Sequence, residues 1–243
     1  MIDKTNIYIS TSNNYHHCLQ PFAYLFNKFW SDKQKVTFLG YDTPTQQLPD
    51  NFNFISLGKQ LGPEWYANDL RKFFESINDK QFIYTMEDQF ILDYVNKDLV
   101  NTLLQECESS NVGRACLTNS IFQTHMGKKH DLYKQVSDYE LITYSQDSAF
   151  RITCEWSVWD KDYICSYLKD GLDPWQFERI SSNQSKYDSV DLIGCKNTVA
   201  IQHAEAIRRK DTDKMFDYRL VNEGRELDMN IQNELENYIK GQA

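Results

Sequence analysis

Short β-prone segments alternate with amphipathic helical segments through the first half of this 243-residue chain, and no other feature limits its fold as much. The segments "NIYIS" (6–10), "KVTFLG" (35–40) and "FNFISL" (52–57) are rich in β-branched and aromatic residues, as strands are. Residues 19–30 and 66–77 instead repeat apolar side chains at helical spacing. Strands that alternate with helices predict an α/β fold with a mixed, mostly parallel sheet flanked by helices.

The pattern continues to residue 118 and is less regular beyond it. The remaining predicted elements are strands at 82–92, 112–118, 130–146 and 150–159 and helices at 99–107, 163–168, 174–183 and 230–240. We find no internal repeat and no composition typical of a linker between domains. The sequence therefore predicts a single domain over residues 1–243.

Composition narrows the classes of partner. The net charge of −9 argues against non-specific binding to nucleic acid or to an anionic membrane surface. No run approaches the roughly 20 apolar residues of a membrane helix, so we expect no integral membrane segment. The six cysteines are scattered without a C-x-x-C pair, which excludes the usual zinc signatures and indicates a reducing, cytoplasmic location.

Two adjacent carboxylates, Glu87 and Asp88, interrupt the apolar segment "FIYTMEDQFIL" at 82–92. Charges at the end of a buried strand are costly unless a cation, hydrogen bonds or water compensate them. In sheets of this kind, ligands bind at the carboxyl ends of the strands. The pair is therefore a candidate site for a cation; the alternative is that it begins a solvated loop or caps a helix.

Three segments resemble blocks of a known family, and they occur in the family's order. They are "TSNNYHHCLQPFAYLFNKFWSD" (11–32), "FIYTMEDQFI" (82–91) and "CEWSVWDKDYICSYLKDGLDPWQFE" (154–178). Together they resemble small bacterial and viral GT-A-type glycosyltransferases of polysaccharide and lipopolysaccharide biosynthesis. The resemblance implies a GT-A-like domain in which residues 1–118 bind a nucleotide sugar. Residues 119–243 would then bind the acceptor and end in a helix.

The resemblance implies a divalent cation, Mn²⁺ or Mg²⁺, at the acidic strand end. Aligned on Phe90, the two acids of the family fall on Glu87 and Asp88, and Gln89 takes an aromatic position. Aligned as an Asp-x-Asp motif, the second acid would fall on Gln89, a poorer metal ligand. We prefer the first alignment because it keeps both acids. A cation held by carboxylates can bridge and neutralise the phosphates of a nucleotide sugar.

Further donor contacts are expected from the turn after the first strand and from the late part of the chain. Thr11, Asn13 and Tyr15 fall where the family's polar turn meets the nucleotide base; the alternative is a turn that caps the next helix. His203 falls where such enzymes often supply a late metal or phosphate ligand, although a structural histidine is the commoner case. Arg208 belongs to the densest basic cluster, which could neutralise a diphosphate or remain solvated.

The segment "DPWQFE" supplies the candidates for chemistry on the acceptor. Glu178 is the candidate general base and Asp173 the substitute for it, because an inverting transfer needs a carboxylate opposite the leaving diphosphate. Trp175 is the candidate for stacking on an acceptor sugar. The alternative for Glu178 is a carboxylate that complements the dipole of a helix.

The sequence thus predicts an inverting glycosyltransferase that moves a sugar from a nucleotide donor, expected to be a UDP-sugar, to a glycan hydroxyl. Two rivals remain open. One is an inactive nucleotide- or sugar-binding module, suggested by Gln89. The other is a sugar nucleotidyltransferase, which would usually carry a Gly-rich basic loop where this chain has "TSNNYHHC".

Overall fold

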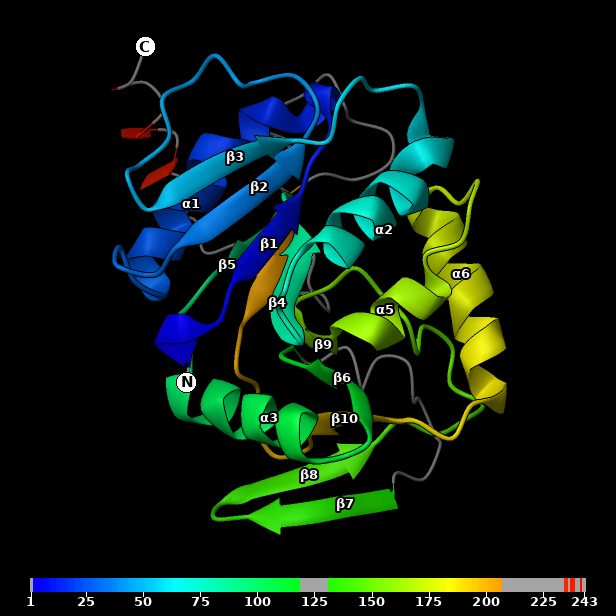
Figure 1. The fold of residues 1–243 in the computed structure, drawn as a ribbon. Helices are drawn as coiled ribbons and strands as arrows, with labels where there is room; N and C mark the ends of the chain where they lie inside the picture. The colour runs from blue at the N-terminus through cyan, green and yellow to red at the C-terminus, as the bar shows by residue number, and fades with distance from the viewer. Residues whose placement is uncertain (1, 119–130, 207–233, 236, 239–240, 242–243) are drawn as a thin grey trace.

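A nine-stranded sheet dominates the computed structural model, which describes residues 2–118 and 131–206 together with residues 234, 235, 237, 238 and 241. The strand order is β3-β2-β1-β4-β9-β6-β10-β8-β7 (Figure 1). Strands β9 and β8 run antiparallel to their neighbours, and the other seven share one direction. The predicted mixed, mostly parallel sheet is confirmed.

The elements alternate along the chain as predicted for residues 6–118. The strands are β1 (Ile7–Ser10), β2 (Val36–Gly40), β3 (Phe52–Ser56), β4 (Gln81–Met86), β5 (Gln89–Ile91), β6 (Val112–Cys116), β7 (Asp131–Val136), β8 (Tyr139–Thr143), β9 (Ser157–Asp160), β10 (Asp191–Cys195) and β11 (His203–Glu205). The helices are α1 (Leu19–Phe29), α2 (Tyr66–Ser76), α3 (Lys97–Ser109), α5 (Lys161–Tyr167) and α6 (Pro174–Gln184). Strand β11 pairs with β5 in a separate two-stranded ribbon.

Hydrophobic side chains cover both faces of the central strands. On β4, Ile83 packs with the residues of α1 and α3, whereas Phe82 and Tyr84 pack with those of α2, α5 and α6. These three helices lie together on one side of the sheet (Figure 1). Successive side chains of a strand point to opposite faces, so a doubly covered strand must be apolar throughout. This explains the nearly continuous apolar run before Glu87.

A glycine allows one helix to lie close to the sheet. A Cβ atom at Gly113 of β6 would come within 2.5 Å of the Tyr163 ring on α5. Any larger residue would therefore push α5 away from β6.

One predicted strand is wrong over most of its length. Of the segment 150–159, only residues 157–159 belong to a strand, β9, and residues 150–156 form an irregular connection. Side chains of α6 accept hydrogen bonds from the backbone of this connection. The Ser182 Oγ accepts from the Ile152 N–H at 3.0 Å, and the Glu178 Oε1 accepts from the Cys154 N–H at 2.7 Å.

The predicted C-terminal helix lies mostly outside the described residues. Residues 234, 235, 237, 238 and 241 are helical, and Glu234 forms an ion pair of 2.5 Å with Lys28 of α1. Among the described residues, no helix is both long enough and apolar enough to cross a bilayer.

Candidate active site

A cavity of about 1040 Å³ opens at the carboxyl ends of β1, β2 and β4. Its size is at the upper end of the range typical of sites for small molecules. Its lining residues are Ser10, Thr11, Ser12, Asn14, Tyr15, Leu39, Tyr41, Leu57, Gln60, Gly62, Pro63, Tyr66, Leu70, Met86, Glu87, Asp88, Gln89, Ala149, Phe150, Thr153, Cys154, Glu155, Pro174, Trp175, Glu178 and Glu205. The structure therefore brings most of the predicted site residues to one place.

The loop after β1 forms one wall of the cavity. The Thr11 N–H donates to the Leu39 carbonyl at 2.8 Å, which joins this loop to the end of β2. Gly40 permits this approach, because a Cβ there would come within 2.8 Å of the Thr11 methyl group. Tyr15 follows on the same wall, and its pKa is raised by burial and then by the nearby carboxylates of Glu87 and Asp88.

Asn13 belongs to the same loop but does not line the cavity. Its side-chain amide donates to the Asp42 Oδ2 at 2.6 Å, and its Oδ1 accepts from the Asp42 N–H at 2.9 Å. The two bonds hold the loop after β1 against the loop after β2. Asn13 was predicted to contact a nucleotide base, but in the structure its side chain joins the two loops. Its neighbours Ser12 and Asn14 line the cavity instead.

Glu87 and Asp88 form the turn between β4 and β5. The backbone fixes this turn from two directions, because the Glu87 N–H donates to the Ser10 carbonyl at 3.1 Å and the Ala206 N–H donates to the Asp88 carbonyl at 2.7 Å. The side chain of Glu87 is only 2% exposed. Its Oε2 and the Asp88 Oδ1 are buried without a hydrogen-bond partner. Hydrogen bonds therefore leave part of the cost of burying these carboxylates uncompensated.

The pKa values of this turn reflect that cost. Burial raises the pKa of Glu87 well above its ordinary range, and the Asp88 carboxylate adds to the effect. Burial also raises the pKa of Asp88 to about 7, with a further contribution from Glu205 and an opposing one from the Gln89 side chain. A cation bound beside these carboxylates would favour their charged forms and would therefore oppose both shifts.

Strand β11 brings Glu205, and not His203, to the cavity. Glu205 lies opposite Gln89 in the ribbon, whereas His203 lies opposite Ile91 and is 4% exposed. Glu205 is a site residue that the sequence analysis missed. The predicted histidine lies two positions away in "QHAE", so the segment was identified but not the residue that reaches the cavity. Arg208 lies outside the described residues.

Helix α6 contributes Glu178 and Trp175 to the lining of the cavity. The Glu178 Oε1 accepts from the Thr153 hydroxyl at 2.8 Å and from the Cys154 N–H at 2.7 Å. Burial raises the pKa of Glu178, and these two hydrogen bonds oppose the rise. Glu178 is the fifth residue of α6, beyond the turn in which a carboxylate complements the helix dipole.

Asp173 is the N-cap residue of α6. Its Oδ1 accepts from the Gln176 N–H at 2.7 Å, and the Gln176 side chain accepts from the Asp173 N–H at 3.2 Å. This reciprocal pair is a capping box, which stabilises the start of α6. Asp173 does not line the cavity.

Other lining residues were also missed, among them Tyr41, Tyr66, Phe150 and Glu155. A signal existed for Tyr41, because it directly follows β2 and the carboxyl ends of neighbouring parallel strands lie at one edge of a sheet. Phe150 and Glu155 lie on the irregular connection that was predicted to be a strand, so their positions could not be derived from strand periodicity.

The strand-end carboxylates fit a divalent cation in chemistry. No group of three or more His, Cys, Asp or Glu residues set to hold a metal occurs in the described part of the chain. Mg²⁺ in enzymes that bind phosphates commonly takes only one or two protein carboxylates, and substrate phosphates and water complete its shell. Glu87 and Asp88, with buried oxygens that lack partners, match that requirement.

Neither a family model nor a curated protein matches the sequence. Solved structures do match the fold. One is the mannosyltransferase PcManGT from Pyrobaculum calidifontis in complex with GDP-Man and Mn²⁺, with a TM-score of 0.52 and 10% identity over 85% of this chain and 58% of that chain. Another is S. aureus TarS 1-349, with a TM-score of 0.49 and 8% identity over 82% of this chain and 59% of that chain.

The chain spans less than three-fifths of the length of either matched structure, 58% and 59%. The match to PcManGT shows that this chain has the GT-A-like fold of glycosyltransferases. At this level of identity the match defines the fold, and the site must support the function.

Proposed function

We propose that this protein is a glycosyltransferase that moves a sugar from a nucleotide-sugar donor to a hydroxyl group of a glycan. One observation carries the proposal. A single cavity at the carboxyl ends of the parallel strands is lined by the adjacent carboxylates of Glu87 and Asp88 and by the carboxylate of Glu178. A transfer of this kind requires a place for the donor diphosphate and a base for the acceptor in one enclosed space.

The donor would lie along the wall formed by the loop after β1. Tyr15 offers an aromatic ring, and Thr11 and its polar neighbours offer hydrogen bonds to a base or ribose. The diphosphate would then lie next to Glu87 and Asp88. Mn²⁺ or Mg²⁺ bound there would neutralise the phosphates and stabilise the charge of the leaving group. PcManGT is recorded with GDP-Man and Mn²⁺, which supports this class of ligand; we propose a UDP-sugar as the donor.

The acceptor would enter from the side of α6. Its hydroxyl oxygen forms a bond to the anomeric carbon while the bond from that carbon to the diphosphate breaks, and the diphosphate leaves with the electron pair. Glu178 takes the hydroxyl proton. Because its Oε1 already accepts two hydrogen bonds, the proton would go to Oε2. Attack opposite the leaving diphosphate inverts the anomeric configuration. The raised pKa of Glu178 suits a general base near neutral pH.

A panel of nucleotide sugars tests the proposal. The melting temperature of the protein is measured with UDP-, GDP- and CMP-sugars, each with and without Mn²⁺. At about 100 times its Kd, a true donor raises the free energy of unfolding by about 2.7 kcal/mol. We expect this rise for at least one donor with Mn²⁺, and a smaller rise in Asp88→Asn. A panel without any shift would end the proposal.

A second function, an inactive nucleotide-binding module, is favoured by Gln89, which lines the cavity next to the two acids in place of a stronger metal ligand. Incubation with the donor alone distinguishes the two. A transferase slowly releases nucleoside diphosphate, a binding module releases nothing, and a nucleotidyltransferase would form pyrophosphate. We place the transferase in polysaccharide biosynthesis in a reducing cytoplasm, where its six free cysteines would stay reduced.

A further inference from the structure

Phe150 combines two properties that a purely structural residue rarely has. Its φ angle is 52°, in the left-handed region that favours glycine, and its side chain is 51% exposed. A bulky residue in this region strains the backbone. An exposed ring recovers little of that cost through packing. Strained residues of this kind are concentrated at binding and catalytic sites.

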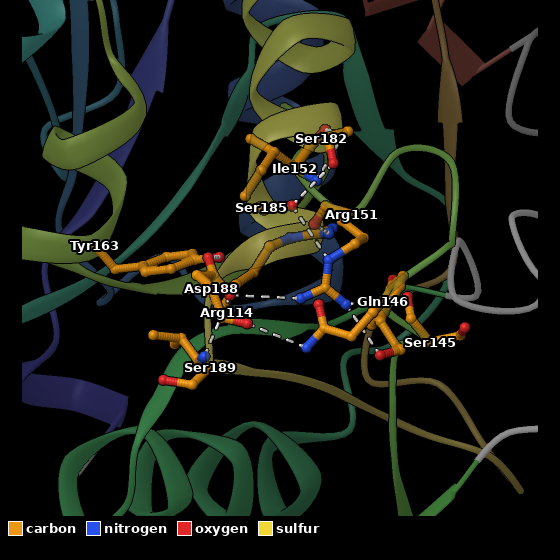
Figure 2. Close-up of polar contacts among 12 residues, drawn as sticks. Arg114, Ser145, Gln146, Arg151, Ile152, Tyr163, Ser182, Ser185, Asp188 and Ser189 are labelled. Carbon is orange, nitrogen blue, oxygen red and sulfur yellow. Dashed lines mark hydrogen bonds and ion pairs between the residues drawn. The ribbon is translucent and has the colours of Figure 1, made fainter.

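Two buried arginines hold the backbone around Phe150 in place. Arg151 is 1% exposed, and its guanidinium donates to the carbonyls of Tyr144 and Ser145, both at 3.0 Å. Figure 2 shows this group between Ser145, Ser185 and Asp188. Arg114 donates to the Arg151 carbonyl at 2.8 Å. The chain that follows Phe150 is therefore anchored by side chains, which explains how the strained conformation persists.

Phe150 and Trp175 line the same cavity from different elements. Trp175 is 49% exposed and belongs to the first turn of α6, which the capping box of Asp173 and Gln176 fixes. Trp175 and Glu178 are three residues apart in this helix and thus share one of its faces. A ring bound against Trp175 would therefore lie beside the carboxylate of Glu178.

We propose that Phe150 and Trp175 together form a subsite that stacks on the apolar face of an acceptor sugar. A pyranose presents C–H groups on its ring faces and hydroxyl groups at its edges, and the negative face of an aromatic ring attracts such C–H groups. The inference rests on the proposed function, because it assigns the acceptor to the part of the cavity that α6 lines. It adds Phe150 as a specificity-determining residue, held by Arg151 and Arg114.

Saturation-transfer NMR tests the subsite with defined probes: methyl β-D-glucopyranoside, methyl β-D-galactopyranoside and methyl α-D-mannopyranoside. For at least one of them, the wild type should transfer saturation to the C–H protons of one ring face. Phe150→Ala and Trp175→Ala should each weaken that binding about tenfold, equivalent to about 1.4 kcal/mol. Phe150→Trp should restore it. Tyr94→Ala is the matched control, because Tyr94 is 75% exposed and does not line the cavity.

Two results would overturn the subsite. One is a wild type that transfers saturation to none of the three glycosides, and the other is a Phe150→Ala variant that binds as tightly as the wild type. Binding of UDP with Mn²⁺ is measured on every variant, which also verifies that each is folded. A wild type that binds neither UDP nor GDP nor CMP with Mn²⁺ would refute the proposed function. Normal nucleotide binding with sugar affinity that does not depend on Phe150 would refute only the subsite.

Discussion

The pKa of Asp88 makes cation binding at the strand end depend on pH near neutrality. Burial and the nearby Glu205 raise this pKa to about 7. A metal ligand must be deprotonated, so protons and Mn²⁺ compete for the carboxylate. We therefore expect nucleotide binding with Mn²⁺ to strengthen as the pH rises from 6 to 8. An ordinary aspartate, with a pKa of about 3.9, is ionised throughout this interval and would produce no such change.

The size of the effect follows from the titration of one group. With a pKa of about 7, Asp88 is about 9% ionised at pH 6 and about 91% ionised at pH 8. The apparent affinity should therefore rise about tenfold, or about 1.4 kcal/mol. At saturating nucleotide, this corresponds to an increase in the ligand-induced shift of Tm of roughly 3–6 °C for a chain of this size. The pKa of Glu87 is raised in the same direction, so its titration has the same sign as that of Asp88.

Without a cation, the stability of the protein should change in the opposite sense. A carboxyl group whose pKa is higher in the folded state than in the unfolded state binds more protons when folded. Its contribution is complete below the unfolded pKa of about 3.9 and is lost as the pH rises through the folded value of about 7. The metal-free protein should thus lose stability as the pH rises from 6 to 7, where the ligand-induced gain from Mn²⁺ and nucleotide increases.

The assay is differential scanning fluorimetry with UDP at pH 6, 7 and 8, with Mn²⁺ and in parallel with Mg²⁺. Asp88→Asn is the control, because it keeps the backbone bonds of the Asp88 carbonyl but removes the titrating group. The nucleotide phosphate also titrates in this pH range, and the comparison of wild type with Asp88→Asn removes that contribution. Equal pH dependence in wild type and Asp88→Asn would refute the assignment of the cation to Asp88.

Four further results are expected. Glu178→Gln should lower kcat about 10²–10⁴-fold with unchanged donor affinity, because glutamine keeps the Oε1 acceptor for Thr153 and Cys154; normal kcat would exclude Glu178 as the base. Gln89→Asp should lower the Tm of the metal-free protein by added repulsion and enlarge the Mn²⁺-induced shift; no gain with Mn²⁺ would reject the Asp-x-Asp alignment. Asp173→Ala should lower stability by about 1 kcal/mol through loss of the cap and leave donor hydrolysis unchanged; loss of hydrolysis at normal Tm would return Asp173 to the catalytic candidates. Phe150→Gly should be about 1 kcal/mol more stable in denaturant unfolding than Phe150→Ala; equal stabilities would show that the backbone there is not strained.

The fold of the first half could be predicted from the sequence because each strand there is apolar on both faces or alternates with clear turns. In β4, residues 82–85 are buried, and the strand ends just before the acidic residues begin. The same pattern located Glu87 and Asp88, since a parallel sheet positions its strand ends by register. The local sequence pattern of each strand therefore also predicts which strand ends lie side by side.

The irregular wall of the cavity could not be predicted because tertiary contacts determine its conformation. The alternation in residues 150–156 resembles a strand, but the backbone bonds to Ser182 and Glu178 of α6 and to the side chain of Arg114. A buried arginine appears in a sequence only as a charge, which periodicity assigns to a solvent-exposed face. Tertiary contacts between distant segments likewise determine that Asn13 bonds to Asp42 and that Glu205, and not His203, lines the cavity.

The charges around the cavity connect the fold to the proposed chemistry. Five carboxylates line it, those of Glu87, Asp88, Glu155, Glu178 and Glu205, and no lysine, arginine or histidine lines it among the described residues. A diphosphate would be repelled from such a wall unless a cation accompanied it. Hard oxygen ligands of this kind select Mg²⁺ or Mn²⁺ over softer metals. Burial, together with repulsion from nearby carboxylates, raises the pKa values of Glu87 and Asp88 in the metal-free protein. In the proposed mechanism, the same cost would make donor binding conditional on the cation, and Glu178 of α6 would take the acceptor proton.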